Sequence, residues 1–291
     1  MTLTEKKSRI YTLDSIRGIL MILVILGHFM EIIPGLGAKH PMYKIIYSFH
    51  MPMFLFLSGF FGKFHWKGIL KFSGLYILFQ TLYLLFQRTV LWGLPLSGFS
   101  PSFQTPYWLL WYLLTLVYYY FSIAVLRYIP KRCYPFAILA AIGISLVSGC
   151  FSSVGYPWTL SRTFFFLPYF VTGYFCRQCQ NDINKFYSAL SVTQKAVYAL
   201  LSLLTVVGAS FLCALWKLQP FMLYGSYSYR TGYGPLTRLQ MLVIAFVWIH
   251  FLFSLTFLVP KLRIPFLEWI GQHTLPIYLL HGFVVKLCGM L

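Results

Sequence analysis

Long apolar runs separated by short polar loops are the feature that most constrains this chain. About 20 apolar residues suffice to cross a bilayer as a helix. Runs of this kind recur near residues 15–33, 46–62, 69–92, 107–127, 134–151, 163–178, 195–216, 238–259 and 273–290. A backbone in hydrocarbon must satisfy its own hydrogen bonds. The pattern therefore predicts an all-α, polytopic integral membrane helical bundle of nine to ten transmembrane helices. Residues 218–236 form either a re-entrant tenth segment or an interfacial loop.

The composition supports a membrane protein with one domain. Hydrophobic residues make up 59% of the chain and charged residues 10%, whereas soluble domains have roughly 45–50% apolar and about 25% charged residues. Because no hydrophilic stretch is long enough to fold separately, we predict a single membrane-embedded domain over residues 1–291. A net charge of +18 would suggest nucleic acid for a soluble protein. Here most basic residues lie in short loops, so the predicted surroundings are a lipid bilayer and no nucleic-acid partner is expected.

The distribution of basic residues predicts the orientation in the membrane. The polar stretch 1–10 is followed by an apolar run too long for a cleavable signal, with no small-residue cleavage site at its end. With the N-terminus inside, fifteen of the lysines and arginines fall on the inner side and eight on the outer side. The positive-inside rule thus favours a multi-pass protein of the plasma (inner) membrane with a cytoplasmic N-terminus.

The first apolar run, 11–33, carries Asp14, Arg17 and His28. Ionisable groups inside hydrocarbon cost a few kcal/mol each and usually face a bundle interior. Arg17 and His28 are eleven positions apart, so on a helix they differ by about 20° around the axis and by roughly 16 Å along it. Asp14 precedes Arg17 at the i, i+3 spacing that allows an ion pair. One helix face is predicted to hold an ion pair near its start and an imidazole near mid-membrane.

Two further candidate positions lie around the second run. His50 opens this run, with Pro52 in the first turn, where a missing N–H costs nothing. His50 is either an interfacial histidine bonded to water or headgroups, or a residue that meets a substrate. Lys67 and Lys71 follow in a basic loop. They reflect the positive-inside bias, or they dock an anionic cofactor through point charges.

Other candidates begin or line the later runs. Trp108 and Trp111 start the fourth run, where aromatic residues form a membrane-interface belt or the wall of a sugar site. Arg162 lies at the outer end of its run and either reaches to headgroups or contacts a substrate. Tyr278 and His281 share one face of the last run, as packing residues or as a site wall.

The six cysteines carry little functional signal. Cys176 and Cys179 form a lone C-x-x-C, and the others are scattered through apolar segments. A single pair of this kind is weak support for redox or zinc chemistry. We interpret all six as small membrane-packed residues, and neither a disulfide framework nor a metal site is predicted.

Four motifs in a fixed order resemble membrane-bound acyltransferase family 3, and within it the fucose O-acetylase-like branch of polysaccharide O-acetyltransferases. The most specific is Arg17, ten intervening residues, then His28. The others are stretches 48–59 (SFHMP to LSG), 162–173 and 270–281 (IG, TL and IYLLH). The resemblance covers nearly the whole chain. Family members are usually longer and have ten spans.

The resemblance implies transfer of an acyl group to an acceptor hydroxyl. The donor would be cytoplasmic acyl-CoA, usually acetyl-CoA, and the acceptor a cell-surface sugar, a lipid-linked glycan or another hydroxyl compound. The paired basic residues that many members carry after the second span are here Lys67 and Lys71. These lysines and Arg17 are the candidate contacts to the cofactor phosphates.

The first run supplies the candidate catalytic residues. A positioned neutral imidazole is the commonest general base, so His28 is predicted to take the proton of the acceptor hydroxyl. Arg17 binds a phosphate or fixes the helix through Asp14. His50 or His281 orients the acceptor or donates to the developing oxyanion. The chain has no G-x-S-x-G, which favours direct transfer over a seryl intermediate.

Two other classes of function stay open from the sequence. A transporter would place intramembrane charges along a permeation path and show repeated halves. No convincing repeat relates residues 1–145 to 146–291. A non-catalytic module that binds or exports a substrate is the second alternative, and the intact pair of Arg17 and His28 argues against it.

Overall fold

The protein is a bundle of helices. The computed structural model describes residues 10–37, 40–97, 99–215, 219–230, 232–260 and 263–290. Its helices are α1 (Tyr11–Ile32), α2 (Pro41–Phe61), α3 (Trp66–Phe86), α4 (Trp111–Leu126), α5 (Tyr134–Ser148), α6 (Leu160–Gln178), α7 (Gln180–Ala189), α8 (Val192–Leu215), α9 (Pro220–Leu223), α10 (Pro235–Leu258), α11 (Pro265–Gln272) and α12 (Thr274–Cys288). One isolated β-bridge joins Arg230 and Tyr233.

Within the described residues, seven helices are long and apolar enough to cross a membrane: α1, α2, α3, α4, α5, α8 and α10, some of them extended by a short turn. The prediction of an all-helical, polytopic membrane bundle is confirmed. The predicted spans 163–178 and 273–290 correspond to α6 and α12. α6 carries Arg162 and Arg177, and α12 has only 15 residues. A total of nine to ten spans stays a prediction. In the described part of 218–236, the short helix α9 precedes the start of α10.

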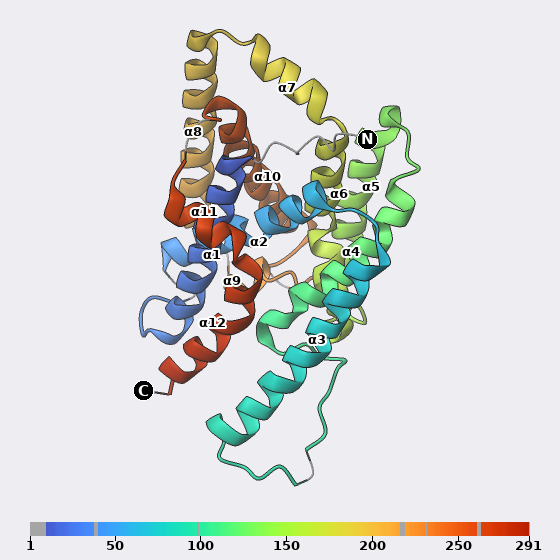
Figure 1. Ribbon diagram of the computed structural model, residues 1–291, viewed down its shortest axis with the longest axis vertical. Helices are drawn as coiled ribbons and strands as arrows, with labels where there is room; N and C mark the ends of the chain where they lie inside the picture. The colour runs from blue at the N-terminus through green and yellow to red at the C-terminus, as the bar shows by residue number, and fades with distance from the viewer. Residues whose placement is uncertain are drawn as a thin grey trace, which may run out of the picture.

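The helices are arranged between two ends of the molecule (Figure 1). α7 lies across the end at which α1 begins, and α12 finishes at the other end (Figure 1). We call the first the N-terminal end and the second the opposite end. Arg17 lies in the first half of α1, and His28 lies a turn before the C-terminal residue Ile32. His28 therefore lies in the half of α1 that is nearer the opposite end, and its depth in the membrane stays a prediction.

Glycines hold the central pair of helices, α2 and α6, in backbone contact. A Cβ added at Gly59 of α2 would overlap the carbonyl oxygen of Phe170, and one at Gly173 of α6 would overlap that of Phe56. Each helix thus places a glycine against the backbone of the other, and the two helices run antiparallel. Small residues let membrane helices approach closely when no hydrophobic force drives them together. The glycines of two sequence motifs therefore have a packing role.

A second reciprocal pair joins α1 to α11. A Cβ at Gly18 would overlap the carbonyl oxygen of Leu267, and one at Gly271 would overlap that of Asp14. α11 thus runs antiparallel to α1 and ends beside its start. The chain then reverses into α12, which follows α1 in the parallel direction, from Thr274 near Arg17 to His281 near His28. This reversal brings the last sequence motif against the first.

Candidate active site

Three adjacent hollows follow the face of α1 that carries Arg17 and His28. The entrance groove, of about 1360 Å³, lies at the N-terminal end. The apolar cavity, of about 210 Å³, shares Arg17 and Phe61 with this groove. The polar cavity, of about 220 Å³, shares Met51 and Tyr278 with the apolar cavity. The hollows form a series from one end of the bundle towards the other.

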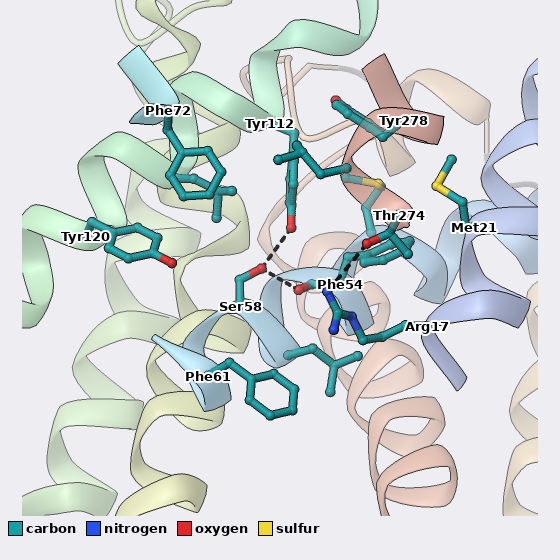
Figure 2. A pocket seen from close by; sticks show the side chains of 14 residues that line it. Arg17, Met21, Phe54, Ser58, Phe61, Phe72, Tyr112, Tyr120, Thr274 and Tyr278 are labelled. Carbon is teal, nitrogen blue, oxygen red and sulfur yellow. Dashed lines mark hydrogen bonds between the residues drawn. The ribbon is translucent and has the colours of Figure 1, made fainter. Parts of the chain in front are cut away.

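The apolar cavity is lined by α1, α2, α3, α4 and α12 (Figure 2). Most of its wall is aromatic or aliphatic. Its polar groups include Ser58, whose hydroxyl is 2.8 Å from the Tyr112 hydroxyl and donates to the Phe54 carbonyl, and Thr274. Such a wall suits a slender, weakly polar group rather than a charged one.

Arg17 stands where the entrance groove meets the apolar cavity. Its guanidinium lies 3.7 Å from the Asp14 carboxylate and donates to the Thr274 hydroxyl at 3.4 Å (Figure 2 shows the second contact). The cation also lies 5.9 Å from the centre of the Phe61 ring. One third of the Arg17 side chain is exposed. The predicted i, i+3 pair is present, and it leaves part of the guanidinium open to the groove.

The polar cavity contains a carboxylate and imidazole pair from the last turns of α1. Nδ1 of His28 is 3.5 Å from a Glu31 oxygen. The other oxygen of this carboxylate accepts hydrogen bonds from the hydroxyls of Tyr43, at 2.9 Å, and Tyr47. The Tyr43 hydroxyl in turn lies 2.7 Å from that of Tyr224. Glu31 is thus fixed by two tyrosines of α2 while it faces the imidazole.

This arrangement determines which nitrogen of His28 can act as a base. A nitrogen facing a carboxylate carries the proton, so Nδ1 is the donor and Nε2 keeps a free lone pair. The tautomer is assigned from the hydrogen-bond network. In serine hydrolases a carboxylate orients a histidine in the same way and stabilises its protonated form. The pair can accept a proton from a substrate hydroxyl.

Two other histidines, His50 and His281, lie near this pair. His281 stacks on His28 with ring centres 5.5 Å apart, and its Nδ1 lies 2.8 Å from the Tyr278 carbonyl oxygen. Nε2 of His281 is buried and has no hydrogen-bond partner among the described residues. His50 is buried, and its Nδ1 lies 2.6 Å from the Ile46 carbonyl oxygen. Both rings therefore present an unprotonated Nε2.

Aromatic side chains and one cation complete the wall of the polar cavity. Trp108 packs on His28 with ring centres 4.4 Å apart, and its backbone has a φ of 36°. This left-handed conformation costs a non-glycine residue of order 1–3 kcal/mol and is concentrated at functional sites. The Arg162 guanidinium stacks on Trp111 and Tyr156, at 4.7 and 4.9 Å from the ring centres. Its Nε donates to the Ser226 hydroxyl at 2.6 Å.

The predicted site residues fall into three groups. The polar cavity is lined by His28, His50, Trp108, Trp111, Arg162 and Tyr278, and His281 contacts it through His28. Asp14 and Arg17 lie at the N-terminal end of α1 and line the entrance groove. Lys67 and Lys71 are exposed near the start of α3 and line none of the three hollows.

Glu31 and its two tyrosines are the residues that sequence analysis missed. Glu31 follows His28 at the i, i+3 spacing that also joins Asp14 to Arg17, so the same rule would have found it. Tyr43 and Tyr47 lie one turn apart in α2. They resemble ordinary interfacial aromatics in the sequence, and only the packing of α2 on α1 gives them a role.

Similarity to known proteins identifies the family of the chain. The chain matches the acyltransferase domain family over residues 10–291. A stretch of 57 residues is 40% identical to "Nodulation protein NolL" of Sinorhizobium fredii (strain NBRC 101917 / NGR234), covering 18% of this chain and 16% of that protein. The similarity to that relative is thus confined to a small part of its length. No solved structure matches the chain. With a family match over nearly its whole length and a polytopic helical bundle, the chain belongs to the acyltransferase 3 family of multi-pass membrane acyltransferases.

Proposed function

We propose that the protein transfers an acyl group, in the simplest case acetyl, from coenzyme A to a hydroxyl of a cell-surface sugar or lipid-linked glycan. The observation that carries this proposal is the pair of His28 and Glu31 in the polar cavity. This cavity is joined by shared lining residues to hollows that begin at the N-terminal end. In this proposal the donor approaches the imidazole from the N-terminal end and the acceptor from the opposite end.

The reaction is a direct transfer. Nε2 of His28 takes the proton of the acceptor hydroxyl while the acceptor oxygen attacks the thioester carbonyl carbon. The carbonyl oxygen becomes an oxyanion in the tetrahedral intermediate. The C–S bond then breaks, and the departing coenzyme A sulfur receives the proton from the His28 imidazolium. Glu31 stabilises this imidazolium through Nδ1–H. Products are the O-acyl acceptor and free coenzyme A.

Other residues of the polar cavity bind the acceptor and the developing charge. Arg162 is the cation of this wall, and its stacking on Trp111 holds the guanidinium in place. We assign it the oxyanion or a polar group of the acceptor. Trp108 and Trp111 offer flat apolar faces for a sugar ring. His50, with Nδ1 bonded to a backbone carbonyl, accepts a hydrogen bond from another acceptor hydroxyl through Nε2. His281, whose Nε2 is buried, acts through its stacking on His28.

The donor enters from the N-terminal end, which we assign to the cytoplasm. The excess of lysine and arginine predicted on that side supports this orientation. The arm of coenzyme A is long, thin and weakly charged, and it suits the apolar cavity between Arg17 and Tyr278. Asp14 lies roughly 21 Å from His28 along the helix axis, so its role is to position Arg17 rather than to touch the reacting atoms.

The test is acetyl-CoA turnover by the protein in nanodiscs, with and without a pool of glycan acceptors. Release of free coenzyme A is measured for wild type, His28→Gln and His250→Gln. His250 is the matched control because it lies in α10, bonds Tyr198 and lines none of the three hollows. We expect turnover in wild type and His250→Gln, and loss in folded His28→Gln. Absence of acetyl-CoA binding and turnover in wild type would overturn the proposal.

A further inference from the structure

The entrance groove differs from the two inner cavities in its charge. Three side chains that carry a permanent positive charge, Arg17, Arg177 and Lys195, line it. Asp14 is the acidic residue in its lining and is paired with Arg17. The groove therefore has a net positive charge at the point where the series of hollows begins. Such a surface attracts a ligand with several negative charges.

Amide side chains lie beside these cations. Gln180, Asn181 and Asn184 of α7 and Gln272 of α11 line the groove. Gln180 accepts a hydrogen bond from Arg177. Amides both donate and accept hydrogen bonds, as the edges of a nucleobase and the hydroxyls of a ribose require. The lining thus combines cations for phosphate with neutral groups for a nucleoside.

α7 is held in place over the groove. Tyr187 on its inner side stacks on Phe257 of α10 with ring centres 4.8 Å apart. The Lys131 ammonium donates to Asp182 on its outer side and holds the pKa of that carboxyl below its usual value. α7 also lies across the N-terminal end in Figure 1. The amides are therefore presented by a docked helix rather than by a free loop.

The groove is also in the right place for one end of a long ligand. Arg17 and Phe61 line both the groove and the apolar cavity. The groove and the apolar cavity thus meet at Arg17, and the apolar and polar cavities meet at Met51 and Tyr278, which is the order that a ligand with a charged head and a long arm would need. Lys67 and Lys71, by contrast, line neither the groove nor the cavities.

We infer that the entrance groove binds the nucleotide end of acyl-CoA, with Arg177 and Lys195 on its phosphates and the α7 amides on the adenosine. This inference rests on the proposed function and refines it. It moves the cofactor phosphates from Lys67 and Lys71, which the structure places in the first turns of α3, to the groove beneath α7. Arg17 then lies at the junction of the diphosphate and the arm.

The experiment compares two acyl donors that share the thioester and differ in the nucleotide. Initial rates are measured with acetyl-CoA and with acetyl-pantetheine for wild type, Arg177→Gln and Lys195→Gln. Loss of one charge-assisted contact to a phosphate is expected to raise KM for acetyl-CoA about tenfold at unchanged kcat. KM for acetyl-pantetheine should not change. Lys185→Gln is the matched control, because it removes a charge from α7 outside the groove lining.

The outcomes separate this inference from the proposed function. Wild type that turns over neither donor would remove the proposed function itself. Turnover of both donors with wild-type KM in Arg177→Gln and Lys195→Gln would overturn the nucleotide site alone. An equal rise in KM for both donors would also overturn it, because the groove would then hold the arm. A rise in KM for acetyl-CoA alone in Lys67→Gln/Lys71→Gln would overturn it as well, because the nucleotide would then bind at the start of α3. Size-exclusion profiles and melting temperatures identify variants that fail to fold.

Discussion

The two ends of α1 carry the same kind of pair in opposite order. Near the start, Asp14 precedes Arg17 by three residues, and its carboxylate oxygen lies 3.7 Å from a guanidinium nitrogen. Near the end, His28 precedes Glu31 by three residues, and Nδ1 of the imidazole lies 3.5 Å from a carboxylate oxygen. A carboxylate at a helix N-terminus is favoured by the helix dipole, whereas one in the last turn is disfavoured by about 0.3–1 kcal/mol. Glu31 is thus held against the dipole by Tyr43 and Tyr47.

The two pairs also differ in the groups that surround them. At the Arg17 end, backbone groups of α11 pack on Gly18 and Asp14, and the Arg17 guanidinium contacts Thr274 and Phe61. At the His28 end they are side chains with hydroxyl, imidazole and indole groups. A backbone contact fixes position, and a side-chain network can bind and exchange protons. The comparison therefore supports a positioning role for the Arg17 end and proton transfer at the His28 end.

The largest expected effect separates the roles of His28 and Arg17. His28→Gln removes the general base, which is worth about 10²–10⁴ in rate, so kcat should fall by that factor. Arg17→Gln removes a contact to the donor and should mainly raise KM for acetyl-CoA. Steady-state kinetics on both variants checks this. Equal losses of kcat in the two variants would contradict the separate roles proposed for the two ends of α1.

The second prediction exchanges each carboxylate for its amide. Glu31→Gln keeps the size of the side chain but loses the charge that stabilises the His28 imidazolium, and we expect kcat to fall roughly 10- to 100-fold. This range follows from charge-assisted hydrogen bonds of about 1.5–3 kcal/mol. Asp14→Asn should leave kcat within about twofold. A pair of variants with indistinguishable kcat values would show that neither carboxylate acts through the imidazole.

The parts of this site that could be predicted from the sequence are those whose residues lie close together along the chain. Arg17 and His28 lie on one helix, so their shared face follows from the helix repeat alone. The i, i+3 pairing of Asp14 is equally local. His281 and Trp108, in contrast, reach His28 from residues far along the chain. Their contact depends on how α12 and α4 pack, which hydrophobic periodicity does not specify.

The fold was predictable to a similar extent. Each predicted apolar run corresponds to a helix, because hydrocarbon leaves the backbone few alternatives. α11 was not predicted as a helix packed on α1, because its eight residues are too few to give a periodic signal. Its contact with α1 depends on Gly18 and Gly271. Each glycine lies in a sequence motif, but the motifs do not show which backbone each glycine contacts.

The third prediction tests the two glycines of α1. A Cβ at Gly18 meets the Leu267 backbone, whereas the nearest atoms to a Cβ at Gly27 belong to the side chains of Tyr47 and Ile46. Gly18→Ala should lower the free energy of unfolding by about 1–3 kcal/mol, since the α11 backbone must move. Gly27→Ala should cost less stability and reduce kcat, because Tyr47 must shift from Glu31. Gly74→Ala in α3 has open space around its Cβ and is the control for both measurements, which are thermal denaturation and turnover.

The smallest effect concerns a single hydroxyl at the His28 end. Tyr43→Phe removes one of the two hydrogen bonds that hold Glu31, and such a bond is worth about 0.5–1.5 kcal/mol. We expect kcat to fall between about two- and tenfold. Tyr76→Phe is the matched control: Tyr76 is also buried and donates to the Phe103 carbonyl at 2.6 Å, outside the polar cavity.

Tyr43→Phe should lose somewhat more stability than Tyr76→Phe, because the Tyr43 hydroxyl bonds both Glu31 and Tyr224 whereas the Tyr76 hydroxyl bonds one carbonyl. Only Tyr43→Phe should lose turnover. If Tyr76→Phe reduced kcat to the same extent, the loss would follow from general loosening of the bundle. A selective loss in Tyr43→Phe would mean that turnover depends on how firmly Glu31 is held, and hence that the carboxylate at the end of α1 acts on the reaction through His28.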